Sequence, residues 1–60
     1  MQLTQMELNT IKELAATESV NAKKFQLYAD NCQDHQLQNI LNQEAQKSFS
    51  NARTLMNFLS

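Results

Sequence analysis

The chain contains neither glycine nor proline in its 60 residues. These two residue types normally mark tight turns and helix breaks, so their absence favours long, uninterrupted helices. A core built from so short a chain rarely supplies more than about 3–5 kcal/mol of stability. Because the chain has a single cysteine, it has no internal disulfide framework to add to that core. The remaining way to bury enough apolar surface is self-association.

The sequence marks the start of a first helix at Thr4. The segment from Thr4 to Glu7 fits a capping box, with Thr4 as the N-cap and Glu7 three residues later. Apolar residues then recur every three or four positions, which predicts a helix over about residues 5–31. This apolar stripe consists of Ile11, Leu14, Ala15, Ala22, Phe25, Tyr28, Ala29 and Cys32.

A second helix is predicted over about residues 35–59, with Asp34 as its N-cap. Its stripe has the same period and contains Leu37, Ile40, Leu41, Ala45, Ser48, Ala52, Leu55, Met56, Phe58 and Leu59. A connection of two or three residues makes neighbouring helices antiparallel. The whole of residues 1–60 is therefore expected to form one all-α domain, a long helical hairpin.

Such a hairpin leaves a broad apolar face with nothing to cover it. Two hairpins packed face to face make a four-helix bundle, and a two-fold homodimer is the simplest closed arrangement. We therefore expect a homodimer, with higher oligomers left open. The predicted dimer interface consists of Ile11, Leu14, Phe25, Tyr28, Leu41, Ala45, Leu55 and Phe58.

Glu18 and Glu44 occupy stripe positions where leucine is the usual residue. Buried carboxylates are costly unless they are paired, protonated or bound to metal. In an antiparallel hairpin the middles of the two helices face each other, and a two-fold axis would bring four glutamates together. The predicted polar core layer consists of Glu18, Asn21, Glu44, Lys47, Ser48 and Asn51.

This arrangement resembles the ferritin-like carboxylate bundles, which bind iron or manganese. The resemblance implies Glu18 and Glu44 as metal ligands, but Phe25 stands where those proteins have tyrosine and Lys47 where they have histidine. A lysine ammonium has no lone pair for a metal. We therefore expect no cofactor and a vestigial site in which Lys47 neutralises the glutamates. Weak binding of a hard cation by the carboxylates, and solvated glutamates, stay open as alternatives.

The whole chain is similar to the small spore-coat proteins of the coat F type, found in spore-forming Firmicutes. The resemblance lies in residues 1–8, in residues 23–29 and in the Asp-started second helix that ends at residues 55–59. It implies a ferritin-like helical fold, a place in the spore coat, and other coat proteins as possible partners. The surface is rich in Gln and Asn, which suits hydrogen bonding to other proteins in a dense assembly or simple solvation.

Several function classes lack their usual signals. A net charge of −1 gives no electrostatic footprint for nucleic acid. No apolar stretch approaches the roughly 20 residues that span a membrane, and the N-terminal residues do not resemble a secretory signal. The serines have no His/Asp constellation around them, so nucleophilic catalysis is unsupported. We expect an intracellular protein without nucleic-acid or membrane partners.

These observations favour a non-enzymatic structural or interaction protein that works by assembly. The alternative from the enzyme class is a minimal di-iron or di-manganese carboxylate protein, with Glu18 and Glu44 from both subunits as ligands. A third possibility is an adaptor whose open hairpin face binds a different helical partner.

Overall fold

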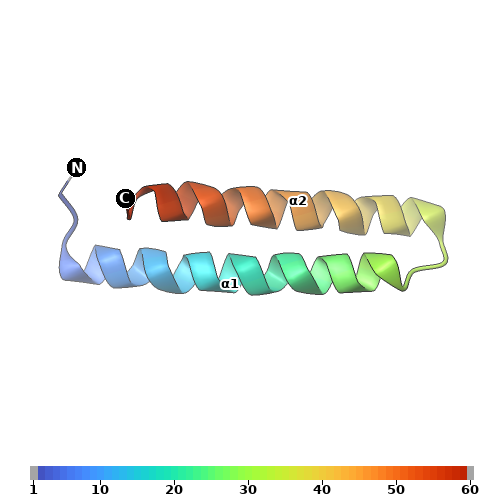
Figure 1. The fold of residues 1–60 in the computed structure, drawn as a ribbon, viewed down its shortest axis with the longest axis horizontal. Helices are drawn as coiled ribbons and strands as arrows, with labels where there is room; N and C mark the ends of the chain where they lie inside the picture. The colour runs from blue at the N-terminus through green and yellow to red at the C-terminus, as the bar shows by residue number, and fades with distance from the viewer. Residues whose placement is uncertain (1, 60) are drawn as a thin grey trace.

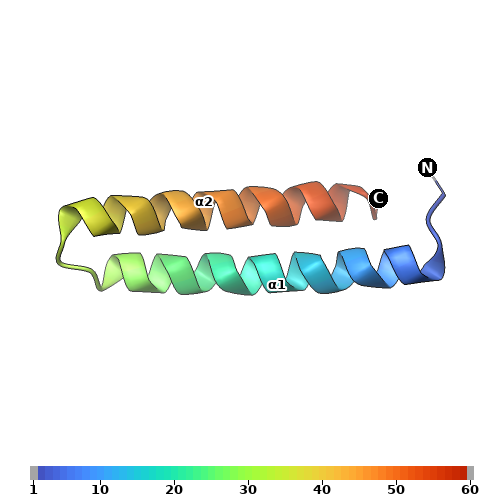
Figure 2. The same cartoon turned by 180° about the vertical axis from the view of Figure 1, so that it is seen from behind.

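The fold is a two-helix hairpin, seen in a computed structural model that describes residues 2–59. Helix α1 spans Gln5–Asp30 and helix α2 spans His35–Asn57. Figures 1 and 2 show the two helices side by side, with both chain ends at one end of the rod and the turn at the other. The rod measures 46 × 14 × 12 Å. The predicted all-α hairpin is confirmed, with no strand within residues 2–59; Met1 and Ser60 lie outside the described residues.

Both predicted N-caps are present. The Glu7 N–H donates to Thr4 Oγ1 at 3.1 Å, and the Thr4 N–H donates to Glu7 Oε1 at 3.0 Å, which completes the capping box. Asp34 Oδ1 accepts from the Leu37 N–H at 3.0 Å. Helix α2 ends at Asn57, two residues before the predicted position, because the Phe58 N–H bonds three residues back, to the Leu55 carbonyl at 3.1 Å. Such tightening of a last turn satisfies carbonyls that have no helical partner.

The two helices meet along a seam of small side chains. The buried residues are Ala15, Ala22, Ala29, Ala45, Ser48 and Ala52, and none is more than 7% exposed. The alanines recur every seven residues, so they stay on one line of each helix. Small side chains at a contact allow helix axes to approach closely within the usual range of 8–10 Å. No large side chain among the described residues is fully buried.

Hydrogen bonds between the helices fix their register. Gln38 Nε2 donates to the Ala29 carbonyl at 2.8 Å, so positions 29 and 38 lie at the same height along the rod. Because the seam repeats every seven residues in both helices, Ala22 then lies opposite Ala45, and Ala15 opposite Ala52. Gln26 Nε2 also donates to Asn42 Oδ1 at 3.1 Å. Two residues that lie at the same height, one on each helix, therefore have residue numbers that add up to about 67.

The hairpin has two broad faces, one on each side of the seam. Ile11 of α1 lies in the same surface hollow as Leu55 of α2 and Phe58, the residue after α2, so these residues belong to one face. We call this side the apolar face. With 3.6 residues per turn, it carries Ile11, Leu14, Glu18, Asn21, Phe25 and Tyr28 from α1, and Leu37, Ile40, Leu41, Glu44, Asn51 and Leu55 from α2, with Phe58 just after the end of α2.

The opposite side, which we call the amide face, is more polar. Lys12 and Ser19 of α1 border a hollow together with Met56 of α2 and Leu59, which follows α2. The bond between Gln26 and Asn42 lies farther along the same side. The exposed large apolar residues on this face are Phe49, Met56 and Leu59, which are 42%, 55% and 38% exposed. The two faces therefore differ clearly in apolar content.

The structure divides each predicted apolar stripe into two lines. The alanines form the seam inside the hairpin, whereas the larger residues lie beside the seam, on the apolar face. Ala45, expected at a dimer interface, is fully buried between α1 and α2 and presents no surface to a partner. The larger side chains stay half-buried or exposed because the alanine seam has already brought the helices together.

Candidate functional site

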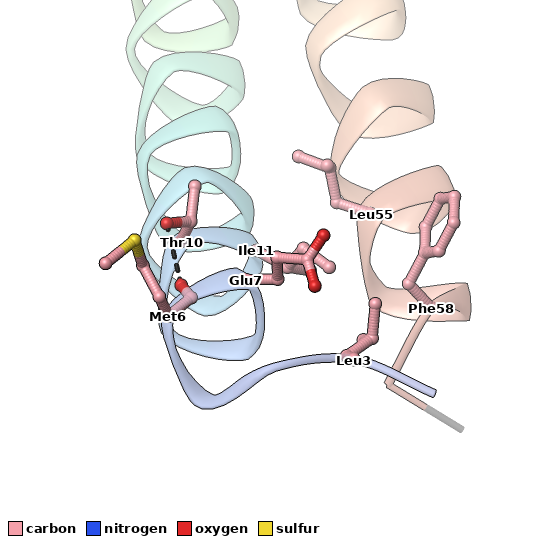
Figure 3. Close-up of a pocket in the computed structure, with 7 residues that line it drawn as sticks. All are labelled: Leu3, Met6, Glu7, Thr10, Ile11, Leu55 and Phe58. Atoms are coloured by element: carbon pink, nitrogen blue, oxygen red, sulfur yellow. Dashed lines mark hydrogen bonds between the residues drawn. The ribbon is translucent and has the colours of Figure 1, made fainter. Parts of the chain in front are cut away.

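The apolar face is the candidate interaction surface, and its open end is concave. A hollow of about 440 Å³ lies there, between the start of α1 and the end of α2. Figure 3 shows Ile11 and Leu55 directed toward one another across the gap, with Leu3 of the N-terminal segment beneath them and Met6 directed away. The residues that line the hollow are Leu3, Met6, Glu7, Thr10, Ile11, Leu55 and Phe58. Among the described residues that line it, Glu7 and Thr10 are the polar ones.

The turn end of the apolar face presents exposed apolar side chains. Tyr28 is 61% exposed and Leu37 is 49% exposed. Phe25 and Leu41 beside them are half-buried. Each of these residues leaves apolar area in water, and covering such area contributes about 25 cal/mol per Å².

The middle of the apolar face is polar. Glu18 and Asn21 on α1 and Glu44 on α2 are half-buried. Lys47 Nζ lies 3.3 Å from Glu44 Oε1, and the two side chains are 70% and 42% exposed. An ion pair this exposed contributes at most about 1 kcal/mol. Lys47 therefore contacts one of the two glutamates, as the sequence suggested, but the pair is solvated in the single hairpin.

The six residues predicted to form a polar core layer differ in burial. Ser48 is buried in the seam, whereas Lys47 and Asn51 are exposed. In the register of the seam, Glu44 lies at the height of position 23, five residues or about 7.5 Å farther along than Glu18. The hairpin therefore brings both glutamates to the middle of one face, at different heights.

A single hairpin does not supply the donors of a di-metal centre. In the part of the chain that the structure describes, no three His, Cys, Asp or Glu side chains are grouped to hold a metal ion. Lys47, at the position of the expected imidazole, offers an ammonium without a lone pair. Glu18 and Glu44 alone do not fit an iron or manganese pair, and a four-carboxylate set would need a second copy of the chain.

Sequence reasoning missed the amides that hold the hairpin together. Gln38 and Gln26 both make cross-helix hydrogen bonds near the turn, although the sequence suggested only an amide-rich surface. A signal was present, since Gln38 stands seven residues before Ala45 and fourteen before Ala52. A polar residue on an alanine line of period seven lies at the seam, where its side chain can reach the other helix.

Comparisons with protein-family models, with curated proteins and with solved structures found no match to this chain. The resemblance to coat F proteins therefore stays a prediction. Within residues 2–59, neither helix carries an apolar segment that is long enough to cross a membrane.

Proposed function

We propose that the protein is a non-enzymatic structural component that works by self-association, through the apolar face, into a homodimeric four-helix bundle. The observation that carries this proposal is the alanine seam. It holds the hairpin together with small side chains and leaves the large ones on the apolar face outside any core. A second copy of the same face is the simplest surface of matching chemistry.

The energetics support a partner. Full burial of a Leu or Phe side chain contributes about 1.5–3 kcal/mol relative to leaving it exposed. Leu14, Leu37 and Phe58 are each close to half exposed in the hairpin, so a partner could still recover a large part of that energy. A bare hairpin of 60 residues has little other stabilisation, because it has no disulfide within the chain and no large buried core.

Sedimentation equilibrium tests this proposal most directly. The expected result is a dimer with twice the 6.9 kDa chain mass. Leu14→Glu places a charge on the apolar face and should shift the equilibrium to monomer. Val20→Glu is a matched control, because Val20 has almost the same exposure, 50% against 48%, but lies about 120° around α1. A monomeric wild-type chain, or equal effects of the two variants, would contradict the proposal.

The same experiment decides the metal alternative, which rests on Glu18 and Glu44 sharing one half-buried face. If a chain that is monomeric alone dimerises only when Fe(II) or Mn(II) is added, the carboxylates serve as ligands. A dimer that forms equally with and without metal supports a vestigial site. A chain that remains monomeric and poorly folded under both conditions favours the adaptor, whose open face needs a different helical partner.

A place in the spore coat, beside other coat proteins, is the cellular part of this proposal. It is supported by the resemblance of three chain segments to coat F proteins and by the exposed Gln and Asn side chains. A fluorescent fusion followed through sporulation of a spore-forming host tests it. Signal confined to the mother-cell cytoplasm, with none on the forespore surface, would exclude this location.

A further inference from the structure

On the apolar face of α1, the order of apolar and polar positions is the same from either end. Its residues lie symmetrically about a midpoint between positions 19 and 20, with apolar side chains at both ends and polar ones at the centre. In order of decreasing distance from that midpoint, the matching positions are Ile11 and Tyr28, Leu14 and Phe25, and Glu18 and Asn21. Each of these pairs sums to 39.

The apolar face of α2 has the same property. Its residues lie symmetrically about a midpoint close to Ser48, again with polar residues at the centre. The matching positions are Leu37 and Phe58, Leu41 and Leu55, and Glu44 and Asn51, and their sums are 95 or 96.

These two midpoints lie at the same height along the rod. In the register fixed by the bond from Gln38 to Ala29, opposite positions sum to about 67, so position 19.5 of α1 lies opposite position 47.5 of α2. We infer that two copies pair about a two-fold axis that crosses both helices at this height, with their turns at opposite ends of the bundle. This inference rests on the proposed dimerisation and specifies its geometry.

In this arrangement α1 lies on α1 of the second copy, and α2 on α2. Each glutamate then meets an amide, since Glu18 lies opposite Asn21 of the second copy and Glu44 opposite its Asn51. Amide N–H groups donate to carboxylate oxygens, so the polar middle can be satisfied without a metal.

The ends of the face also become complementary. The turn end of the second copy, with its exposed Tyr28 and Leu37, lies over the hollow at the open end. Tyr28 is then opposite Ile11, and Leu37 is opposite Phe58. Projecting side chains therefore enter a concave apolar surface, at both ends at once.

The competing arrangement has its two-fold axis along the helices, with both turns at the same end. It places hollow against hollow, so that no projecting side chain fills either one where close packing is expected. It also places no demand on the order of residues within one helix.

Pulsed electron–electron double resonance tests the inference by measuring the distance between nitroxide spin labels on Cys32 of the two copies. Cys32 is the chain's single cysteine, and it is half-buried beside the turn. Opposed turns separate the two labels by about 37 Å, because position 32 then lies at the height of position 7 of the second copy. Turns at the same end bring the labels within about 20 Å, given helix spacings near 10 Å.

The outcomes separate this inference from the proposed dimer. A distance near 37 Å supports opposed turns, whereas a short distance overturns them and leaves the dimer standing. Absence of dipolar coupling, together with a monomer in sedimentation, overturns both. Cys32→Ser combined with Gln33→Cys moves the label to an exposed turn position, and it should give the same long distance if the label on Cys32 does not disturb the dimer.

Discussion

At the residue scale, the protonation of Glu7 makes the stability of the start of α1 depend on pH. The Thr4 N–H donates to the Glu7 carboxylate, and this bond holds the pKa of Glu7 below its usual value of 4.5. A carboxyl group with a lowered pKa in the folded state adds stability above the usual pKa. That stability is lost as the pH falls through the lower, folded-state value.

We expect Glu7→Gln to lower the melting temperature at pH 7 and to have a shrinking effect toward pH 3. Glutamine can still accept the Thr4 N–H bond, but it removes the negative charge that favours a helix N-terminus. Thermal melts of both proteins between pH 7 and pH 3 measure this difference. Glu13→Gln is the control, since Glu13 is exposed in the same helix and outside the cap. A Glu7→Gln effect that is constant with pH would show that the carboxylate's charge is not responsible.

At the element scale, the alanine seam sets how closely α1 and α2 approach. Ala22 is fully buried, and opposite it lies Ala45, which is also fully buried. There is no room at this position for a larger side chain without moving the helices apart. The hairpin therefore depends on small residues at the seam as much as on apolar ones.

Ala22→Leu should destabilise the hairpin by about 1–3 kcal/mol, the usual cost of overpacking. For a domain of this size, each kcal/mol lowers the melting temperature by about 4–8 °C. Ala16→Leu is a matched control, because Ala16 is exposed on the same helix and leucine is a good helix former. Thermal unfolding followed by circular dichroism compares the two. Equal melting temperatures would mean that α1 and α2 do not pack through Ala22.

The sequence predicted the helices well because their signals are local. Thr4, Glu7 and Asp34 act on backbone groups within three residues, so their roles can be read without knowing the rest of the fold. The division of each stripe into a seam and a face was not predicted. Leu14 and Ala15 are consecutive apolar residues, and both belong to the predicted stripe. Only the approach of α2 decides that Ala15 is buried and Leu14 exposed.

The position of the candidate site was predicted more closely than its contacts. The spacing of Glu18 and Glu44 predicted two carboxylates near the middle of one face, and both residues are half-buried in the hairpin. The height difference between them depends on the register. That register is set by the cross-helix bonds of Gln38 and Gln26, which were not predicted, although Gln38 stands on the period-seven line of the seam alanines.

At the scale of the whole molecule, the polar middle of the apolar face costs stability in the proposed dimer. Glu18 and Glu44 would lose water on association, and their gain from amide partners only partly offsets that loss. A polar group at a core position can nevertheless select one pairing over others, as single polar residues do in coiled coils. We therefore expect the polar middle to trade stability for a unique alignment of the two copies.

The double variant Glu18→Leu plus Glu44→Leu tests this trade. Replacement of buried charged groups by apolar ones of similar size is often neutral or stabilising, by up to about 4 kcal/mol, so the melting temperature should rise. The alignment should become less unique, because a continuous apolar face no longer penalises a shifted or reversed pairing. The distribution of distances between the labels on Cys32 would then broaden or divide into long and short populations.

Glu13→Leu is the control, because Glu13 is exposed and lies away from the apolar face, so it should change neither the melting temperature nor the label distances. A clear fall in melting temperature for the double variant would instead mean that the carboxylates are needed, as ligands or as hydrogen-bond acceptors. A higher melting temperature with one unchanged distance would mean that the apolar ends alone set the alignment.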